Sequence, residues 1–242
     1  MKFEDLGLAE PLVRSVREQG YHTMTPIQVK AIPTVLKGRD LMGCAQTGTG
    51  KTAAFTIPLL QELAAEKINP EGRRPRALIL APTRELAAQI GDSITAYGRF
   101  LQVSHTVIFG GVGQGPQEKA MNRGVDIVVA TPGRLLDLMG QGFVKLNAVK
   151  TFIIDEADRM LDMGFREDME ILLGGLHKGH PTLFLSATMN KRVEHLIRPF
   201  GNEPETVSIK RKSLTVASTE QRYYEVRQRS KVEVLSRIID TE

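Results

Sequence analysis

Short apolar runs alternate with longer stretches of helical periodicity from about residue 40 to residue 209. Six candidate strands span residues 41–45, 77–81, 104–109, 126–130, 151–154 and 182–185. Several of them are apolar on successive positions, which is typical of strands covered on both faces. Helical patterns span residues 52–66, 84–100, 132–139 and 191–200. This alternation predicts an α/β fold in which a mostly parallel β-sheet lies between two helix layers.

The two ends of the chain depart from this pattern. Residues 1–36 predict a helical segment, with helices at 8–19 and 26–36 separated by Gly20 and a Thr25-Pro26 cap. Residues 203–221 turn polar and indicate a linker, which we place at 209–220. Residues 221–242 then carry a strand pattern at 222–226 and a helix pattern at 231–239. We interpret them as the start of a second domain cut short, and an appendage docked on the first domain is the alternative.

Composition limits the class of protein. The chain has 242 residues, enough for one large domain plus a fragment, and its 41% hydrophobic and 25% charged residues are ordinary for a globular protein. A net charge of +4 is compatible with nucleic-acid binding without establishing it. No apolar stretch approaches the roughly 20 residues of a membrane span, and the lone Cys44 excludes an internal disulfide. We therefore expect a cytoplasmic protein with no membrane contact.

The most specific chemical pattern joins the first expected strand to a helix and reads Ala45-Gln46-Thr47-Gly48-Thr49-Gly50-Lys51-Thr52. Gly48 and Gly50 let backbone N–H groups turn inward around phosphate oxygens, and the helix N-terminus adds a favourable dipole. Lys51 neutralises β- and γ-phosphate charge, and the Thr52 hydroxyl ligates Mg²⁺. Residue 45 is alanine where the strict pattern has glycine, and a glycine-rich turn is the alternative. The strand–loop–helix context favours a nucleotide-binding phosphate loop.

A second chemical pattern follows the expected strand at 151–154, where Asp155 and Glu156 are adjacent. A carboxylate at the C-terminal end of a buried strand points into the crevice where ligands of such sheets bind. Asp155 can hold Mg²⁺ through its water shell, and Glu156 can position and deprotonate the attacking water. Two adjacent acids in a solvated turn are the alternative. With the phosphate loop upstream, the pattern favours hydrolysis of a nucleoside triphosphate.

The sequence Asp155-Glu156-Ala157-Asp158 spells the signature of DEAD-box RNA helicases, and the chain resembles that family nearly end to end. The sequence of residues 159–165 is most similar to that of the bacterial RhlE-type branch. The resemblance implies a RecA-like ATP-binding domain at 37–208, with ATP and Mg²⁺ as cofactors. It also implies single-stranded RNA as a partner and a second RecA-like domain in the same parent chain.

The family's adenine-recognising Q motif is matched by Phe3, Gly20-Tyr21 and Thr25-Pro26-Ile27-Gln28. The resemblance places Phe3, Tyr21, Pro26 and Gln28 at the nucleotide. The Gln28 amide carries a donor and an acceptor, so it can pair bidentately with adenine N6 and N7, whereas guanine offers the wrong partner to one arm. Tyr21 and Phe3 offer rings against the base, and a place in the core is the equal alternative for each.

Further matches imply contacts with RNA. These matches are Pro82-Thr83-Arg84 at the start of motif Ia, then Gly110-Gly111, and then Thr131-Pro132-Gly133-Arg134. Arginines, hydroxyls and backbone N–H groups of this kind bind phosphate and sugar oxygens, which predicts little sequence specificity and a choice of RNA through its 2′-hydroxyl. Ser186-Ala187-Thr188 resembles motif III, which links hydrolysis to strand separation, and we expect Ser186 and Thr188 to hydrogen-bond Asp158.

Nothing after residue 230 resembles the arginine motifs that the second domain of the family supplies. An arginine finger contributes roughly 10³- to 10⁵-fold to related phosphoryl transfers, so we expect this chain, as a monomer, to bind nucleotide and turn it over slowly or not at all. Two alternatives are a stand-alone nucleotide-dependent binding module and a DNA-directed motor. The end of the sequence within a helical pattern favours truncation over the binding module.

Overall fold

The computed structural model describes residues 1–66, 74–175, 181–209 and 222–241. Contacts divide the chain into two units, Met1–Lys210 and Arg211–Glu242. The first unit contains every strand described here and all helices except the last two. Each unit is described by itself.

Seven parallel strands form one sheet in the order β3-β4-β2-β5-β6-β1-β7. The strands are β1 (Leu41–Cys44), β2 (Ala77–Leu80), β3 (His105–Ile108), β4 (Ile127–Ala130), β5 (Thr151–Ile154), β6 (Thr182–Ser186) and β7 (Glu205–Ser208). The four strands β2, β4, β5 and β6 are buried at every position because helices cover both faces. The predicted parallel α/β fold is confirmed.

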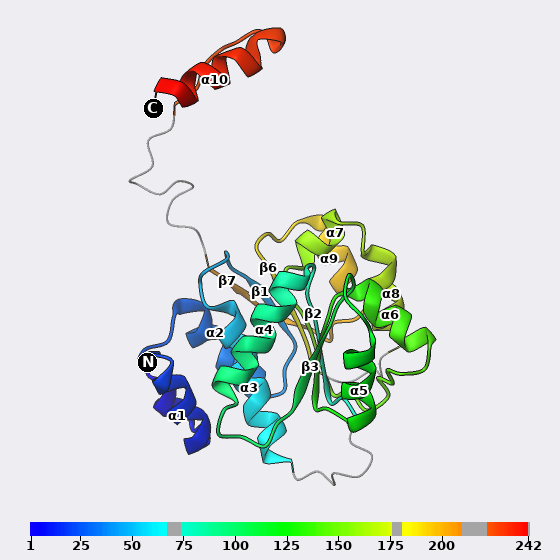
Figure 1. Cartoon of the computed structure of the whole chain (residues 1–242). Coiled ribbons are helices and arrows are strands. Elements are labelled where there is room, and N and C mark those ends of the chain that lie inside the picture. The colour runs from blue at the N-terminus through cyan, green and yellow to red at the C-terminus, as the bar shows by residue number, and fades with distance from the viewer. Residues whose placement is uncertain (67–73, 176–180, 210–221, 242) are drawn as a thin grey trace. The chain divides into compact units, whose positions relative to one another are not determined.

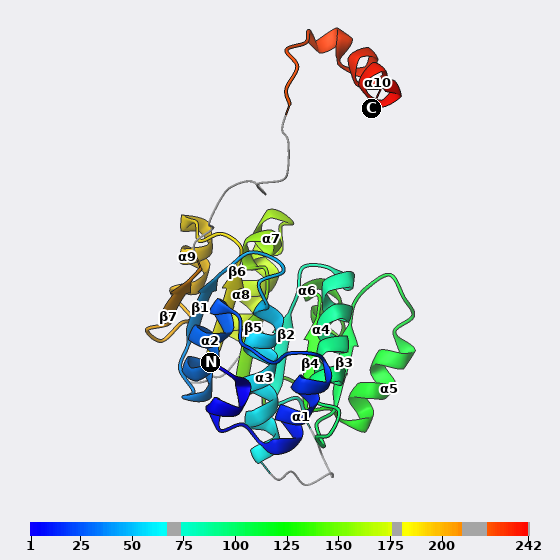
Figure 2. The same ribbon diagram turned by 90° about the vertical axis from the view of Figure 1, so that its left-hand side faces the viewer.

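Two layers of helices cover the sheet (Figures 1 and 2). One layer packs into a single hydrophobic cluster and consists of α1 (Glu10–Glu18), α2 (Pro26–Leu36), α3 (Lys51–Ala65) and α4 (Arg84–Tyr97). The other layer forms a second cluster and consists of α5 (Gly115–Arg123), α6 (Pro132–Gly140), α7 (Ala157–Asp162), α8 (Arg166–Gly174) and α9 (Lys191–Ile197). Side chains alternate across a strand, so Ile79 joins the first cluster while Leu78 and Leu80 join the second.

The strand register brings the candidate site residues to one edge of the sheet. Cys44 at the end of β1 pairs with Ser186 at the end of β6, and Ile154 at the end of β5 pairs with Leu80 and Phe184. Because all strands are parallel, their carboxyl ends meet at this edge. The phosphate loop, the acidic pair and the three RNA motifs all follow these ends directly.

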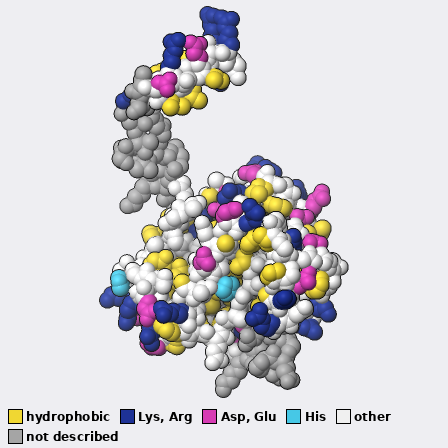
Figure 3. Space-filling view, viewed as in Figure 1, with side chains coloured by type: hydrophobic (Ala, Val, Ile, Leu, Met, Phe, Trp, Pro, Cys, Tyr) yellow, Lys and Arg dark blue, Asp and Glu magenta, His cyan; other side chains and the backbone are white. Residues whose placement is uncertain are grey.

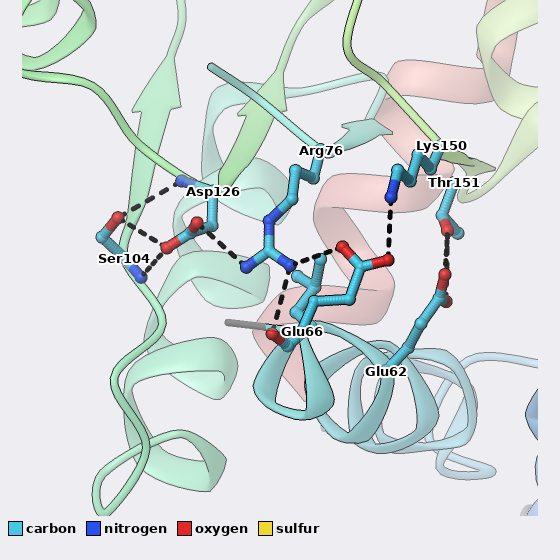
Figure 4. A network of polar contacts seen from close by, with 8 residues as sticks. Glu62, Glu66, Arg76, Ser104, Asp126, Lys150 and Thr151 are labelled. Atoms are coloured by element: carbon cyan, nitrogen blue, oxygen red, sulfur yellow. Dashed lines mark hydrogen bonds and ion pairs between the residues drawn. The ribbon is translucent and has the colours of Figure 1, made fainter. Parts of the chain in front are cut away.

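A network of charged side chains lies at the opposite, amino edge of the sheet (Figure 4). Arg76, just before β2, pairs with Asp126, just before β4, at 3.0 Å, and with Glu66 at the end of α3 at 3.2 Å. Lys150 also pairs with Glu66, at 2.8 Å. The side chains of Arg76 and Asp126 are 8% and 0% exposed, so this cluster ties α3 to two strands from inside the protein.

The expected N-terminal segment 1–36 packs into the main body. The 3₁₀-helix η1 (Phe3–Leu6) and α1 supply Phe3, Leu12 and Val16 to the hydrophobic cluster that α3 and α4 share. Phe3 is 2% exposed. The ring that we expected near a nucleotide base is therefore a core side chain, which was the alternative for this residue.

Two further features of the structure were not expected. The polar stretch taken as a linker begins with β7, which pairs with β1 at the sheet edge, and only its Val207 is buried. An edge strand with one covered side chain looks polar in sequence. Residues 210–221 of the expected linker lie outside the described residues. Helices α5, α7 and α8 were not among the helices expected from the sequence.

The second unit contains η2 (Gln228–Ser230) and α10 (Lys231–Thr241). The predicted helix at 231–239 is confirmed. The predicted strand at 222–226 is wrong, because residues 222–227 have no regular structure. A strand needs a neighbouring strand for its backbone hydrogen bonds, and the described residues of this unit contain none.

Candidate functional site

The phosphate loop closes around its lysine. Gly48 and Gly50 have φ values of 81° and 90°, a left-handed conformation that glycine adopts without steric cost. Gly50 precedes α3, so the positive end of that helix dipole faces the loop. Lys51 is 6% exposed, and its Nζ donates to the carbonyl oxygen of Ala45 at 2.6 Å. A phosphate oxygen would offer this ammonium a charged partner in place of a neutral carbonyl.

The acidic pair stands at the end of β5. Asp155 is 3% exposed, and burial raises its pKa to about 6, an effect that Lys51 offsets in part and Glu156 reinforces. Glu156 has φ 54° and ψ 50°, an uncommon conformation for a residue with a side chain, and it begins α7. Its carboxylate pairs with Arg159 at 3.2 Å. Asp155 and Glu156 both line the cavity at the carboxyl edge of the sheet.

One cavity of about 430 Å³ joins the two motifs. Its lining includes Thr47, Gly48, Gly50, Lys51 and Thr52 from the phosphate loop, and Asp155 and Glu156 from the acidic pair. In the sheet only β6 separates β1 from β5, so the two motifs start about 10 Å apart, within the length of a triphosphate. The expectation that Lys51 and Asp155 face each other across one crevice is confirmed.

Asp155 makes this cavity suitable for a divalent cation. A nearly buried carboxylate with a raised pKa gains from a cation that compensates its charge. The Thr52 hydroxyl lines the same cavity and is a hard oxygen ligand. Among the residues that the structure describes, no group of three or more His, Cys, Asp or Glu side chains could hold a metal ion. The donor set therefore fits an ion that takes most of its ligands from phosphate and water.

Motif III contacts the last acid of the signature. The backbone N–H and the hydroxyl of Thr188 donate to Asp158 at 2.9 and 2.8 Å. Ser186 donates its hydroxyl to the carbonyl of Thr188 at 2.6 Å. Burial raises the pKa of Asp158, but the hydrogen bonds that it accepts, chiefly those from Thr188, outweigh this effect and hold the pKa below its usual value. The expected direct hydrogen bond from Ser186 to Asp158 is not formed, because the Ser186 hydroxyl donates to Thr188. The end of β6 is thus tied to the start of α7.

Gln28 is buried beneath the phosphate loop. Its Oε1 accepts from the backbone N–H of Thr25 at 2.9 Å, and its Nε2 donates to the Gly50 carbonyl at 3.2 Å. A Cβ on Gly50 would lie 2.6 Å from this nitrogen, so Gly50 also makes room for Gln28. The Thr25 donor fixes which end of the amide is oxygen. Each end keeps one further hydrogen-bonding position, and Gln28 lines the cavity.

Tyr21 stands at the rim of the same cavity. It is 42% exposed, and its ring centroid lies 6.0 Å from that of Tyr97, which is buried. Of the other nucleotide-binding expectations, Pro26, Gln46 and Thr49 are not among the residues that line the cavity. Pro26 is the first residue of α2, and the Thr49 hydroxyl donates to the Gln46 carbonyl at 2.6 Å within the loop turn.

A second hollow, of about 420 Å³, gathers the RNA motifs. Six of the nine expected RNA residues line it, namely Pro82, Thr83, Arg84, Gly110, Gly111 and Thr131. Gly111 has φ 79°, and a Cβ there would lie 2.7 Å from Arg84 Nη1. The glycine therefore leaves space for the guanidinium. On the face that Figure 3 shows, basic and acidic side chains are interspersed.

The remaining three RNA expectations lie beside the hollow. Pro132, Gly133 and Arg134 begin α6. Arg134 donates to the carbonyl of Val112 at 3.3 Å and pairs with Asp137 at 3.5 Å. Its side chain is only 17% exposed. Arg134 thus supports the glycine loop that forms one wall of the hollow.

Several lining residues were missed from the sequence. Met163 and Phe165 line the second hollow, and Met163 is 48% exposed. The first cavity is also lined by Leu86, Gln89, Ser93 and Tyr97 of α4. The four-residue spacing of the last three was a readable signal for one helix face.

No described helix is long and apolar enough to cross a membrane.

Several known proteins are similar to this chain in sequence or in fold. The DEAD/DEAH box helicase family model matches residues 25–196. The DEAD-box ATP-dependent RNA helicase CshA of Bacillus subtilis (strain 168) is 42% identical over 238 residues, which cover 98% of this chain and 47% of that protein. CshA of Geobacillus kaustophilus (strain HTA426) is 40% identical, with 98% and 50% covered. The chain spans about half the length of these relatives.

A solved structure agrees with them. The crystal structure of a DEAD box protein from the hyperthermophile Methanococcus jannaschii matches with a TM-score of 0.80 and 37% identity, over 99% of this chain and 63% of that chain. The family model covers most of the present chain, and the phosphate loop and the acidic signature line one cavity. The chain therefore belongs to the DEAD/DEAH box helicase family.

Proposed function

We propose that this chain is the ATP-binding half of an ATP-dependent RNA helicase, and that it binds Mg-ATP and the backbone of one RNA strand. One observation carries the proposal: two hollows lie on the same sheet edge, one lined by Lys51 and Asp155, the other by Arg84 and Gly111. Helix α4 lines both, because Arg84 and Glu85 border the second hollow and Gln89 borders the first.

Mg²⁺ in the first cavity would be held by the Thr52 hydroxyl and, through water, by Asp155. When bound, the ion neutralises phosphate charge and favours the ionised form of Asp155. Lys51 binds the β- and γ-phosphates, and the N–H groups of the glycine turn orient them. Glu156 accepts the proton of the attacking water at a carboxylate oxygen. The Glu156–Arg159 ion pair keeps that carboxylate beside the cavity.

Adenine is selected by Gln28, which lies against the phosphate loop, and by Tyr21 at the cavity rim. The Gln28 amide has its oxygen fixed by Thr25 and its nitrogen by Gly50, and it keeps one acceptor and one donor position. This pair matches adenine N6 and N7 and mismatches guanine O6. Tyr21 offers its exposed ring to the base. Phe3 is left out of this proposal because it is buried in the core.

RNA binding would use backbone contacts. Arg84 and the N–H groups at Gly110 and Gly111 donate to phosphate oxygens, and Thr83 and Thr131 donate to phosphate or sugar. The apolar Met163 on the same wall suits a ribose or base face. Such contacts do not read sequence, so a 2′-hydroxyl is the feature that selects RNA over DNA.

Motif III completes the proposed roles. Ser186 and Thr188 connect the end of β6 to Asp158, so a shift at the acidic signature would move the end of that strand. This link suits a role in coupling hydrolysis to strand separation. The coupling itself requires a second RecA-like domain in the same parent chain.

Finer assignments rest on sequence. The wording of residues 159–165 supports a place in the RhlE-type branch, although the relatives described above carry the CshA name. The domain limits at 36/37 and 208/209, a cytoplasmic location and a monomeric state stay predictions. A DNA-directed motor and a stand-alone binding module are the alternatives.

Hydrolysis assays on this chain and on a longer protein with a second domain would test the proposal. The longer protein should hydrolyse ATP but not GTP, more strongly with poly(U) than with poly(dT), and should separate short RNA duplexes. This chain alone should hydrolyse ATP roughly 10³-fold or more slowly, since it lacks the arginines of the other half. Duplex separation by this chain alone, or equal stimulation by poly(dT), would contradict the proposal.

A further inference from the structure

One face of α4 forms a polar wall that the proposed function does not yet use. Gln89, Ser93 and Tyr97 are spaced four residues apart and all line the first cavity. They face the phosphate loop and the acidic pair, which line the same cavity. A row of polar side chains along one wall of a nucleotide cavity is a candidate for recognition of the ligand.

The two ends of this wall can be assigned. Helix α4 begins at Arg84, just after β2, whose last residue, Leu80, pairs with Ile154 immediately before the acidic pair. This end is the phosphate end. Tyr97 at the other end contacts Tyr21, which belongs to the expected base site. Gln89 lies about 7.5 Å along the helix from Arg84 and about 12 Å from Tyr97.

The order of base, ribose and phosphates in ATP then indicates which part of the nucleotide lies beside Gln89. The ribose lies between the base and the phosphates, and Gln89 lies between the start of α4, on the acidic-pair side, and Tyr97, which contacts Tyr21. The Gln89 side chain is exposed and makes no hydrogen bond with any residue in the described part of the chain. Ser93 donates its hydroxyl to the backbone carbonyl of Gln89, so this contact leaves the Gln89 carboxamide uninvolved. A carboxamide supplies both a donor and an acceptor, as ribose hydroxyls require.

We propose that Gln89 recognises the ribose of the bound nucleotide by hydrogen bonds from its carboxamide to the 2′- or 3′-hydroxyl. The inference rests on the proposed function, because it takes the first cavity as an ATP site. Its consequence is that the helix whose first turn borders the RNA hollow also touches the sugar of ATP.

Calorimetric titration of this chain with Mg-ATP, 2′-deoxy-ATP and 3′-deoxy-ATP tests the proposal. The unmodified chain should bind at least one deoxynucleotide about fivefold more weakly than ATP, the loss expected for one hydrogen bond. Gln89→Met, of similar length but without hydrogen-bonding groups, should bind ATP about fivefold more weakly and lose that preference. Gln102→Met is the matched control, because Gln102 is also exposed but lies away from the lining, and it should change neither value.

The thermal unfolding midpoint of Gln89→Met should equal that of the unmodified chain, since no internal hydrogen bond is lost. Gln89→Ala also lacks the carboxamide and should lose the same preference for ATP. It therefore controls for any effect of the methionine side chain itself. A Gln89→Met chain that still distinguishes ATP from the deoxynucleotides as the unmodified chain does would overturn the ribose assignment alone. Absence of ATP binding by the unmodified chain would overturn the proposed function itself.

Discussion

Replacing Glu156 with glutamine in the longer protein should lower ATP turnover by about 10²- to 10⁴-fold while Mg-ATP binding stays near its original strength. Glutamine has the size of glutamate but cannot take a proton from water. The substitution removes the Arg159 ion pair as well, but that pair is more than half exposed on its Arg159 side and contributes little to stability. Steady-state hydrolysis and nucleotide titration measure the two effects separately.

Glu167→Gln is a suitable control for this experiment. Glu167 lies in the first turn of α8, exposed and outside both hollows. The Glu167→Gln substitution should leave ATP turnover unchanged. If Glu156→Gln retained turnover, another group would have to accept the proton and Glu156 would lose its assigned role.

Arg76→Met should destabilise the chain by about 3–5 kcal/mol. Its guanidinium contacts Asp126, Glu66 and the carbonyl of Leu63, and the Asp126 side chain is fully buried (Figure 4). Methionine removes a buried positive charge that lies 3.0 Å from the fully buried Asp126 carboxylate, and losing such an ion-pair contact in a medium of low polarity is costly. The Ser104 hydrogen bonds to Asp126 would remain. Denaturant unfolding followed by circular dichroism measures the loss.

Arg166→Met gives the matched comparison. Arg166 pairs with Glu170 one turn along α8, and their side chains are 66% and 45% exposed. The free energy of unfolding should change by no more than about 0.5 kcal/mol. Equal effects of the two substitutions would mean that the amino-edge cluster does not hold α3 to the sheet as described.

The sheet was predictable because its central strands are buried on both faces and therefore apolar without interruption. The phosphate loop and Asp155 were predictable because their chemistry requires particular residues at fixed places after a strand. The strand β7 was missed since an edge strand with a single buried residue, Val207, has no such pattern. The strand expected at 222–226 failed because a strand depends on a partner that local sequence does not reveal.

Where the sequence allowed a side chain to lie either in the core or at the site, only tertiary packing determined which environment it occupies. Phe3 and Tyr21 looked alike in sequence, yet η1 buries the first in the core and the loop before α2 leaves the second at the cavity rim. Gln28 was expected to face a base, but its contacts with Thr25 and Gly50 depend on how α2 meets the phosphate loop. Gln89 has a spacing signal but belongs to no chemical motif that would single it out.

The central claim is that the phosphate loop and Asp155 hold one magnesium–triphosphate between them. Calorimetric titration of ATP into this chain, with Mg²⁺ and with a chelator, tests it most directly. Because burial raises the Asp155 pKa to about 6, the carboxylate is ionised at pH 7.5 and largely neutral at pH 5. Mg²⁺ should tighten ATP binding at least about tenfold at pH 7.5, and less as the pH falls through 6. Asp155→Asn should weaken the dependence on Mg²⁺ at pH 7.5 and remove the part of the pH dependence that comes from this carboxylate. An Asp155→Asn chain with undiminished Mg²⁺ dependence would contradict the account.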